Sequence, residues 1–277
     1  MIAAEQANLT VVDLTPTIGS EVNTDVSTLL SGTYAPQIRA LLEERGVLVF
    51  REIKLTDAQQ VAFTKTLGTI VDEGENNIYK VTMDPMANAG AEYLKGSFFW
   101  HLDGTLQQTP VFASLLSCCR LAPVGGQTEF CNTYAAYDSL PGPEKQMLDH
   151  LKVVHSPEAA QRHVTPEPSY VELQTWRKRV AANTLPLVWK HRSGRKSLVL
   201  GVTAAYVVGK SWEDSAELLC RLRDHATRPH LVYRHEWKVG DLVIWDNTGT
   251  MHRALPYALD SGRMMHRTKL RGEEPFI

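Results

Sequence analysis

Apolar residues along this chain occur mainly in short runs that turn-forming residues separate. In the first half these runs are Val11–Leu14, Gly46–Arg51, Trp100–Thr105, Val111–Leu121 and Gln127–Cys131. The second half adds Leu185–His191, Lys196–Gly201, His230–Trp237, Asp241–Trp245, Thr250–Leu255 and Arg263–Leu270. Short apolar runs bounded by Gly, Pro, Asn and Asp are typical of β-strands. The pattern therefore predicts a mostly β protein.

Apolar residues recur at helical spacing in four further stretches, which are Tyr34–Arg45, Thr56–Gly68, Tyr134–Leu151 and Trp212–Ala226. Thr56 and Gln59 match a capping box, in which two side chains satisfy the free N–H groups at a helix start. Ser211 is a suitable N-cap for the last stretch. Many short strands with flanking helices predict an α+β fold with a jelly roll (double-stranded β-helix) or sandwich core and helices packed outside.

Two polar segments interrupt this pattern, residues 72–97 and residues 156–184. Both are long for plain connections, and loops of such length often cover binding sites. We expect lid segments here, although the composition of residues 156–184 fits a flexible surface excursion equally well. No repeat or linker divides the chain, so residues 1–277 are expected to form a single domain.

Composition and charge exclude several classes of protein. The 277 residues are 43% hydrophobic and 22% charged, with a formal net charge of -2, which argues against a nucleic-acid partner. Residues 1–6 lack the basic and apolar parts of a signal peptide, and no apolar run is long enough to span a membrane. The four cysteines show no C-x-x-C spacing and are expected to be reduced thiols. We therefore predict a cytoplasmic protein without a membrane partner.

Three side chains form a candidate metal site. His101 and Asp103 are two residues apart, so on an extended strand both would point to the same face. His252 follows a strand and a tight turn, which would place it at the mouth of the sheet. Two histidines and one carboxylate with open positions opposite are the ligand set of non-haem Fe(II) oxygenases. A His-x-Asp alone fits a polar strand end equally well, so the later histidine matters.

A pair of arginines follows this site in the sequence. Arg263, Met265 and Arg267 alternate along one predicted strand, so both guanidinium groups share a face. Arginine presents a planar fork that suits a carboxylate, and a buried cation without a partner is costly. Two inward-facing arginines beside a metal site therefore indicate anionic ligands. For each arginine alone, a salt bridge with an acidic protein side chain is the competing interpretation.

The order of these motifs resembles a known family. His-x-Asp, Gly-Gly-x-Thr-x-Phe, Gly-Asp-Leu-Val-x-Trp-Asp-Asn, and then His with two Arg occur in the order of the TauD/TfdA family of Fe(II)- and 2-oxoglutarate-dependent dioxygenases. The likeness covers Gly46 to Arg271. Ala-Ala-Tyr-Asp-Ser-Leu-Pro, Ser-Gly-Arg-Lys and Val-Tyr-Arg-His place the chain closer to the aryloxyacetate (TfdA-like) branch.

The resemblance implies a role for seven residues. It implies His101, Asp103 and His252 as the Fe(II) ligands, and Thr128 with Arg263 as the residues that hold the carboxylate of the cosubstrate 2-oxoglutarate. Arg267 corresponds to an arginine that meets the acidic group of the prime substrate in several members. Lys80 lies near a position that contacts the substrate carboxylate in the aryloxyacetate branch, in a segment that aligns poorly.

The resemblance also implies an activity. With Fe(II), 2-oxoglutarate and O₂, such an enzyme hydroxylates a small carboxylate-bearing organic substrate of the aryloxyalkanoate type, with ether cleavage as one outcome and release of succinate and CO₂. The alternatives are a taurine, alkyl-sulfonate or sulfate ester dioxygenase, an oxygenase of natural-product biosynthesis, a metal-binding sensor and a zinc hydrolase. Residues 72–97 lack the histidine of the taurine enzymes, which disfavours a taurine-like sulfonate. A homo-oligomer, dimer or tetramer, is expected.

Overall fold

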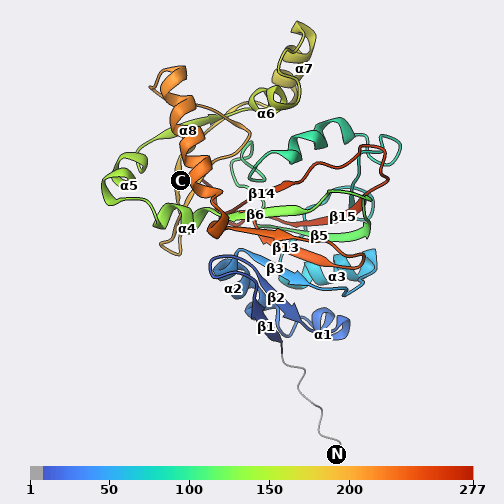
Figure 1. The fold of residues 1–277 in the computed structure, drawn as a ribbon. Helices are drawn as coiled ribbons and strands as arrows, with labels where there is room; N and C mark the ends of the chain where they lie inside the picture. Colours follow the sequence, from blue (N-terminus) through green and yellow to red (C-terminus); the bar gives the residue numbers. More distant parts are fainter. Residues whose placement is uncertain (1–8, 277) are drawn as a thin grey trace, which may run out of the picture.

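Two β-sheets lie face to face in the computed structural model, which describes residues 9–276 (Figure 1). The larger sheet consists, in spatial order, of β1 (Thr10–Asp13), β2 (Ser20–Asn23), β3 (Val47–Phe50), β13 (Leu242–Asp246), β5 (Ala113–Arg120), β15 (Met264–Leu270) and β4 (Tyr79–Val81). The smaller sheet consists of β12 (Val232–His235), β6 (Thr128–Asn132) and β14 (Thr250–Ala254). Neighbouring strands are antiparallel except β2 and β3.

An apolar layer fills the space between the two sheets. Alternate residues of the larger sheet, such as Val49, Trp245 and Met265, point toward the smaller sheet and meet Phe130 and Tyr233 there. Strand β13 is buried along its whole length because its other face is covered as well. A central strand with both faces covered has a continuous run of apolar residues rather than an alternating pattern. This run is the reason that the strand could be predicted from the sequence.

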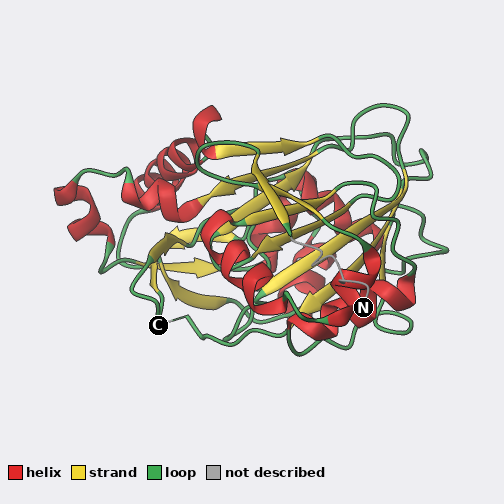
Figure 2. Cartoon of the chain, turned by 90° about the horizontal axis from the view of Figure 1, so that it is seen from below, coloured by secondary structure: helices red, strands yellow, loops and turns green. Residues whose placement is uncertain are grey.

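Helices α1 (Val26–Ser31), α2 (Ala35–Arg45) and α3 (Asp57–Leu67) cover the outer face of the larger sheet (Figures 1 and 2). The capping box predicted at the start of α3 is present, because the side chains of Thr56 and Gln59 each bond to the backbone N–H of the other residue. Ile38, Leu42 and Phe63 are buried against the sheet.

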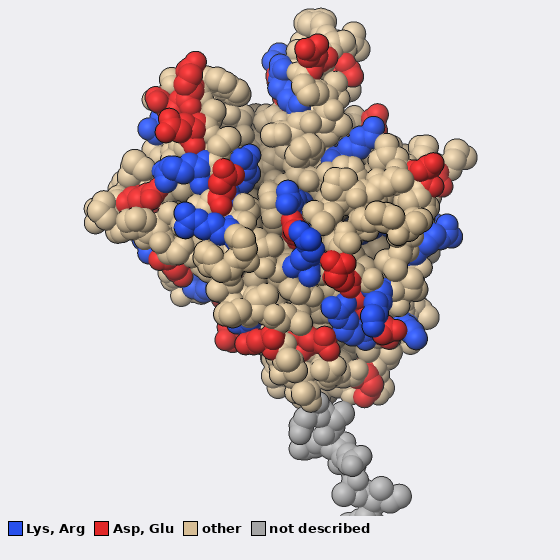
Figure 3. Space-filling model, viewed as in Figure 1, with Lys and Arg blue, Asp and Glu red and all other residues tan. Residues whose placement is uncertain are grey.

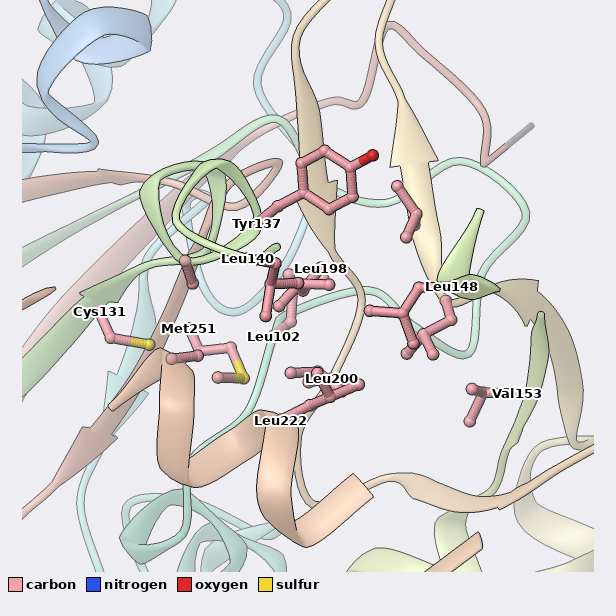
Figure 4. Close-up of a cluster of buried hydrophobic side chains, with 14 of the residues drawn as sticks. Leu102, Cys131, Tyr137, Leu140, Leu148, Val153, Leu198, Leu200, Leu222 and Met251 are labelled. Atoms are coloured by element: carbon pink, nitrogen blue, oxygen red, sulfur yellow. The ribbon is translucent and has the colours of Figure 1, made fainter. Parts of the chain in front are cut away.

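A second apolar cluster lies on the outer face of the smaller sheet (Figure 4). Cys131 and Met251 of the sheet pack there against Leu222 of α8 (Trp212–Ala226) and against α4 (Thr133–Asp138) and α5 (Gly142–Leu148). Ser211 caps α8 as predicted, accepting a hydrogen bond from the backbone of Asp214. Two short ladders extend this layer: β11 (Ala204–Val207), β7 (Lys152–His155) and β8 (Asn183–Pro186), then β10 (Lys196–Leu198) with β9 (Val188–Lys190).

The prediction of a strand over Trp100–Thr105 is wrong. Only His101 makes a β-bridge, with His252, and Asp103 lies in the turn that follows. Gly104 has a φ of +92°, and a Cβ there would meet the backbone of Pro110 at 2.7 Å. A residue that must adopt this left-handed conformation ends an extended strand. His101 and Asp103 therefore do not share a strand face, and the turn brings their side chains together instead.

The predicted helix over Tyr134–Leu151 is interrupted after α4, because Pro141 and Gly142 begin the separate helix α5. The predicted strand Leu185–His191 divides into β8 and β9, and the start of His230–Trp237 forms the 3₁₀ turn η2 (Pro229–Leu231) before β12. These differences between predicted and observed element bounds do not change the element on which any candidate site residue lies.

Both polar segments contain regular structure. Residues 72–97 include β4, which pairs with β15, and most of the 3₁₀ helix η1 (Ala91–Phe98). Residues 156–184 contain α6 (Pro157–Val164) and α7 (Tyr170–Arg179), each with a serine N-cap. These two helices project above the sheets (Figure 1). Ser156 and Ser169 are thus N-cap residues that mark the starts of two helices. The helices were not predicted because the segment contains few apolar residues.

Basic and acidic side chains alternate over the face shown in Figure 3. Within residues 9–276 no helix has both the length and the apolar character needed to cross a membrane. Residues 1–6, which carried the prediction that there is no signal peptide, lie outside the described part of the chain.

Candidate active site

The backbone of His101 is paired with that of His252 on β14. Each residue donates its N–H to the carbonyl oxygen of the other, at 3.0 Å from His101 and 2.9 Å from His252. The two imidazole rings consequently lie with their centres 4.0 Å apart. His252 is opposite Phe130 of β6, whose ring lies in the layer between the sheets, so the histidine pair faces the interior of the sandwich.

Asp103 joins the two histidines from the turn at Gly104. One carboxylate oxygen of Asp103, one ring nitrogen of His101 and one ring nitrogen of His252 all lie within 4.8 Å of one another. The Nδ1 of His101 is 2.9 Å from the carbonyl oxygen of Phe99, to which it donates in the tautomer that leaves Nε2 with its lone pair. Nε2 lies 3.9 Å from an oxygen of Asp103.

A hydrogen-bond chain holds the other oxygen of Asp103. Ser114 on β5 donates to it at 3.2 Å, and Asn247 donates to the Ser114 hydroxyl at 3.0 Å. The indole N–H of Trp245 in turn donates to the side-chain oxygen of Asn247 at 2.8 Å. Three residues from two neighbouring strands and the turn after them therefore fix which carboxylate oxygen faces the histidines.

The protonation states suit a metal site. Burial opposes ionisation of Asp103, but nearby positive charges, Lys269 and Arg267 among them, outweigh it and hold the pKa of this carboxyl below its ordinary value. Burial and the neighbouring His101 hold the pKa of His252 well below its ordinary value. A charged carboxylate and a neutral imidazole are the forms that coordinate a metal ion.

These residues fit a divalent metal ion. The Nδ1 of His252 is buried and has no hydrogen-bond partner among residues 9–276. A buried polar atom without a partner is costly, and a metal ion bound through this nitrogen would give it one. Two nitrogens and one oxygen on one side of a common point form the set that binds non-haem Fe(II).

Arg263 lies buried at the start of β15 and has no carboxylate partner within residues 9–276. Its side chain donates to the carbonyl oxygen of Gly126 at 3.1 Å, and its guanidinium lies 4.8 Å from the ring centre of Tyr257. Burial lowers the pKa of Arg263 from its ordinary value. Gly126 has a φ of +78°, and a Cβ there would lie 2.9 Å from Arg263 Nε, which makes glycine necessary at this position.

Thr128 on β6 lies in the same interior region. It is opposite Ala254, two residues after His252 on β14, and its side chain is buried. The Thr128 hydroxyl oxygen accepts a hydrogen bond from the indole of Trp237 at 2.9 Å, which leaves the hydroxyl hydrogen available to a further acceptor.

Arg267 and Lys269 continue the inward face of β15, as the alternation of Arg263 and Met265 predicts. Both contribute to the low pKa of Asp103. Lys269 is opposite Ser114 in the ladder, and Ser114 is the residue that binds Asp103. Arg267 also lies over the ring of Tyr79, 4.6 Å from its centre. Both cations pair with Glu73, so the acidic protein partner considered for Arg267 is present.

Lys80 lies apart from this group. On β4 it is opposite His266, whose ring contacts Asp57 at the start of α3, so Lys80 belongs to the outer face of the sheet. Tyr79 is the β4 residue opposite Arg267. This arrangement gives no support to Lys80 as a substrate-contacting residue.

Sequence reasoning missed four residues of this site. Lys269 could have been found, because it continues the spacing of two residues from Arg263 through Arg267. Asn247 lies in a motif that was noted without a role. Glu73 left no local signal, since its partner Lys269 lies 196 positions away, and the contact of Ser114 with Asp103 depends on the fold of the turn between them.

The fold, together with the grouping of two histidines and one aspartate, matches what is expected of a metal-dependent dioxygenase. Residues 10–269 match the family described as "Taurine catabolism dioxygenase TauD, TfdA family", and the chain belongs to this family. An α-ketoglutarate-dependent 2,4-dichlorophenoxyacetate dioxygenase from Burkholderia sp. (strain RASC) is 34% identical, over 92% of this chain and 91% of the relative. An α-ketoglutarate-dependent sulfate ester dioxygenase from Pseudomonas putida is 32% identical, over 93% and 88%.

Solved structures agree with this assignment. The crystal structure of AAD-2 in complex with Mn(II) and N-oxalylglycine superposes with a TM-score of 0.84 and 30% sequence identity, and covers 98% of this chain and 100% of that one. A taurine dioxygenase from Burkholderia xenovorans gives a TM-score of 0.77 with 30% identity, over 96% and 92% of the two chains.

Proposed function

We propose that this protein is an Fe(II)- and 2-oxoglutarate-dependent dioxygenase that hydroxylates a small carboxylate-bearing substrate of the aryloxyalkanoate type. The observation that carries the proposal is the buried Arg263 without a carboxylate partner in residues 9–276, directly before strand β15, whose Lys269 is opposite the Ser114 that donates to Asp103. A buried guanidinium needs an anion, and 2-oxoglutarate supplies one while its other end reaches the metal.

His101, Asp103 and His252 hold the metal ion in this proposal. When bound, Fe(II) supplies, with 2-oxoglutarate and O₂, the power to oxidise an unactivated C–H bond. The chain of Trp245, Asn247 and Ser114 keeps the Asp103 carboxylate oriented. Such outer hydrogen bonds set both the geometry and the strength of metal binding.

Arg263 and Thr128 hold the distal carboxylate of 2-oxoglutarate. The guanidinium can donate two parallel hydrogen bonds to a carboxylate. Trp237 donates to the Thr128 oxygen, so the hydroxyl hydrogen of Thr128 is free to donate to the same carboxylate. N-oxalylglycine, present in the similar AAD-2 structure, carries two carboxylates as 2-oxoglutarate does.

The prime substrate is an acid, and Arg267 receives its carboxylate. Overall, the substrate, 2-oxoglutarate and O₂ give the hydroxylated product, succinate and CO₂. If the oxidised carbon carries an ether oxygen, the hydroxylated product is a hemiacetal, which collapses with net ether cleavage. Similarity to the 2,4-dichlorophenoxyacetate enzymes supports this substrate class, and the sulfate ester relative makes sulfate esters the second candidate.

Succinate release with a panel of substrates tests the proposal. We expect 2,4-dichlorophenoxyacetate to stimulate Fe(II)- and O₂-dependent succinate release, and its methyl ester, taurine and an alkyl sulfate to do so far less. Stimulation by the alkyl sulfate alone would assign the enzyme to sulfate esters. Absence of succinate with every acid, together with hydrolysis of an ester, would indicate a zinc hydrolase instead.

We further propose that the two facing sheets are the double-stranded β-helix of this family and that residues 1–277 form one domain. Residues 72–97 and 156–184 are the segments proposed as lids: the first contains Tyr79, whose ring lies against Arg267, and the second contains His163, whose ring centre is 5.1 Å from that of Phe99, two residues before His101. A homo-oligomer, either a dimer or a tetramer, and a cytoplasmic location stay predictions.

A further inference from the structure

Two cations next to the metal site share a single acidic partner. Glu73 lies 3.2 Å from the Nε of Arg267 and 3.2 Å from the Nζ of Lys269. A second contact joins Arg267 Nη2 to Glu73 at 3.4 Å. The three side chains are only 16–20% exposed, so they form a partly buried cluster of net charge +1.

The cluster faces the place where a substrate must lie. Arg267 and Lys269 are on the inward face of β15, and Lys269 is opposite Ser114, the residue that donates to Asp103. An acid bound to this pair would therefore have the rest of its body close to the metal.

The contacts to Glu73 are long for ion pairs. Charge-assisted N–H···O bonds are typically about 2.7–2.9 Å. Elsewhere in this protein, Glu129 lies 2.6 Å from Arg234 and 2.7 Å from Arg253, whereas the exposed pair of Lys238 and Glu52 is 3.3 Å apart. The Glu73 pairs exceed this range, so Glu73 occupies the two cations without optimal geometry.

The cations themselves are held by other groups. The ring of Tyr79 lies against the guanidinium of Arg267, and the backbone of Lys269 accepts a hydrogen bond from Val71 at 2.9 Å. Glu73 comes from the segment before β4, next to the tight turn at Gly74. Departure of the Glu73 carboxylate would thus leave the Arg267 guanidinium against the Tyr79 ring and the Lys269 backbone in its place on β15.

We propose that Glu73 is an internal competitor that the acidic group of the prime substrate displaces from Arg267 and Lys269. This inference rests on the proposed function and adds Lys269 as a second anion-binding residue. An incoming carboxylate replaces Glu73, whose carboxylate turns to solvent. A neutral molecule cannot make this exchange, because it would leave two partly buried cations unpaired. Glu73 therefore makes the site selective for anions and lowers the apparent affinity for them.

The test compares Glu73→Gln with the wild-type protein, with Glu75→Gln as the matched control. Glu75 is exposed and lies two residues away in the same segment. Removing an internal competitor strengthens binding, so Glu73→Gln should lower the KM for 2,4-dichlorophenoxyacetate about threefold to tenfold with kcat nearly unchanged. The KM for the methyl ester should stay the same, and Glu75→Gln should behave as wild type.

Calorimetric titration of 2,4-dichlorophenoxyacetate into the Mn(II)-loaded protein without O₂ gives the same comparison without turnover. Tighter binding by Glu73→Gln supports the inference, even if the acid proves not to be oxidised and the proposed substrate class fails. Weaker or unchanged binding by Glu73→Gln overturns it, as does absence of binding to both proteins. A lower Tm combined with a raised KM would show that Glu73 only anchors its segment.

Discussion

His101 and His252 exchange both of their backbone hydrogen bonds, although the predicted strand around His101 does not form. This single bridge couples the segment before Asp103 to β14 and places the two rings 4.0 Å apart. The metal site is thus built where a turn meets the mouth of a sandwich, rather than along one strand. The sheets provide rigidity, and the turn provides the third side chain.

Removal of the Arg263 side chain should weaken 2-oxoglutarate binding. Arg263→Ala is expected to weaken 2-oxoglutarate binding by at least ~2 kcal/mol, because a desolvated charge pair is lost. The 2-oxoglutarate concentration that gives half-maximal succinate release should rise accordingly. Steady-state kinetics with varied 2-oxoglutarate measures this. Arg192→Ala, at an exposed position, is the control. An unchanged 2-oxoglutarate requirement in Arg263→Ala would remove Arg263 from this role.

Loss of the Ser114 hydroxyl should affect the metal rather than the substrate. Ser114 positions Asp103 and does not itself reach the metal in our account. Ser114→Ala is expected to weaken Fe(II) binding by about tenfold or more, as other changes behind metal ligands do. Titration of the apoprotein with Fe(II) under anaerobic conditions measures the affinity. Equal affinity in Ser114→Ala and wild type would show that the chain through Asn247 has no such function.

Arg267 should determine the preference for acids over esters. Arg267→Ala is expected to raise the KM for 2,4-dichlorophenoxyacetate, because it removes a contact that binds the carboxylate equally in the ground state and in the transition state. The KM for the methyl ester should stay nearly unchanged. The ratio of kcat/KM for the two compounds is the measurement. The role is refuted if the wild-type protein handles acid and ester equally well, or if Arg267→Ala keeps the full preference.

A histidine outside the site should make stability depend on pH. The Cys119 side chain and then Asp57 raise the pKa of His266 to about 9 against the effect of burial. The folded pKa lies above the ordinary 6.5, so the stabilisation is complete below about pH 6.5 and is lost as pH rises through about 9. The Tm of wild type should therefore fall more between pH 6.5 and 9.5 than that of His266→Gln. Parallel pH profiles of the two proteins would disprove this linkage.

Local signals in the sequence predicted the starts of those helices whose N-caps are side-chain hydrogen bonds. The start of α3 follows from Thr56 and Gln59, and the start of α8 follows from Ser211, because each cap forms within four residues. Buried strands such as β13 were also found, since both faces are covered. The face on which Lys80 lies could not be predicted, because it depends on the register of β4 on β15.

Contacts between distant parts of the chain were beyond sequence reasoning. Glu73 and Lys269 are separated by 196 positions, and no periodicity joins them. Ser114 and Asp103 are only 11 positions apart, but their contact depends on how the turn at Gly104 folds against β5, which no local pattern predicts. In contrast, the grouping of His101, Asp103 and His252 could be predicted from their residue types and order even though the predicted strand is wrong, and their role as metal ligands stays a prediction.

Metal-dependent succinate release tests the central claim most directly. We predict that wild-type protein with Fe(II), 2-oxoglutarate, O₂ and 2,4-dichlorophenoxyacetate forms succinate, and that His101→Ala, Asp103→Ala and His252→Ala each lose nearly all of it. Ligands that act as a unit are not additive, so any single loss should cost almost as much as all three. His150→Ala, at an exposed position, should keep full activity. Substantial succinate release by any one of the three ligand variants would contradict the account.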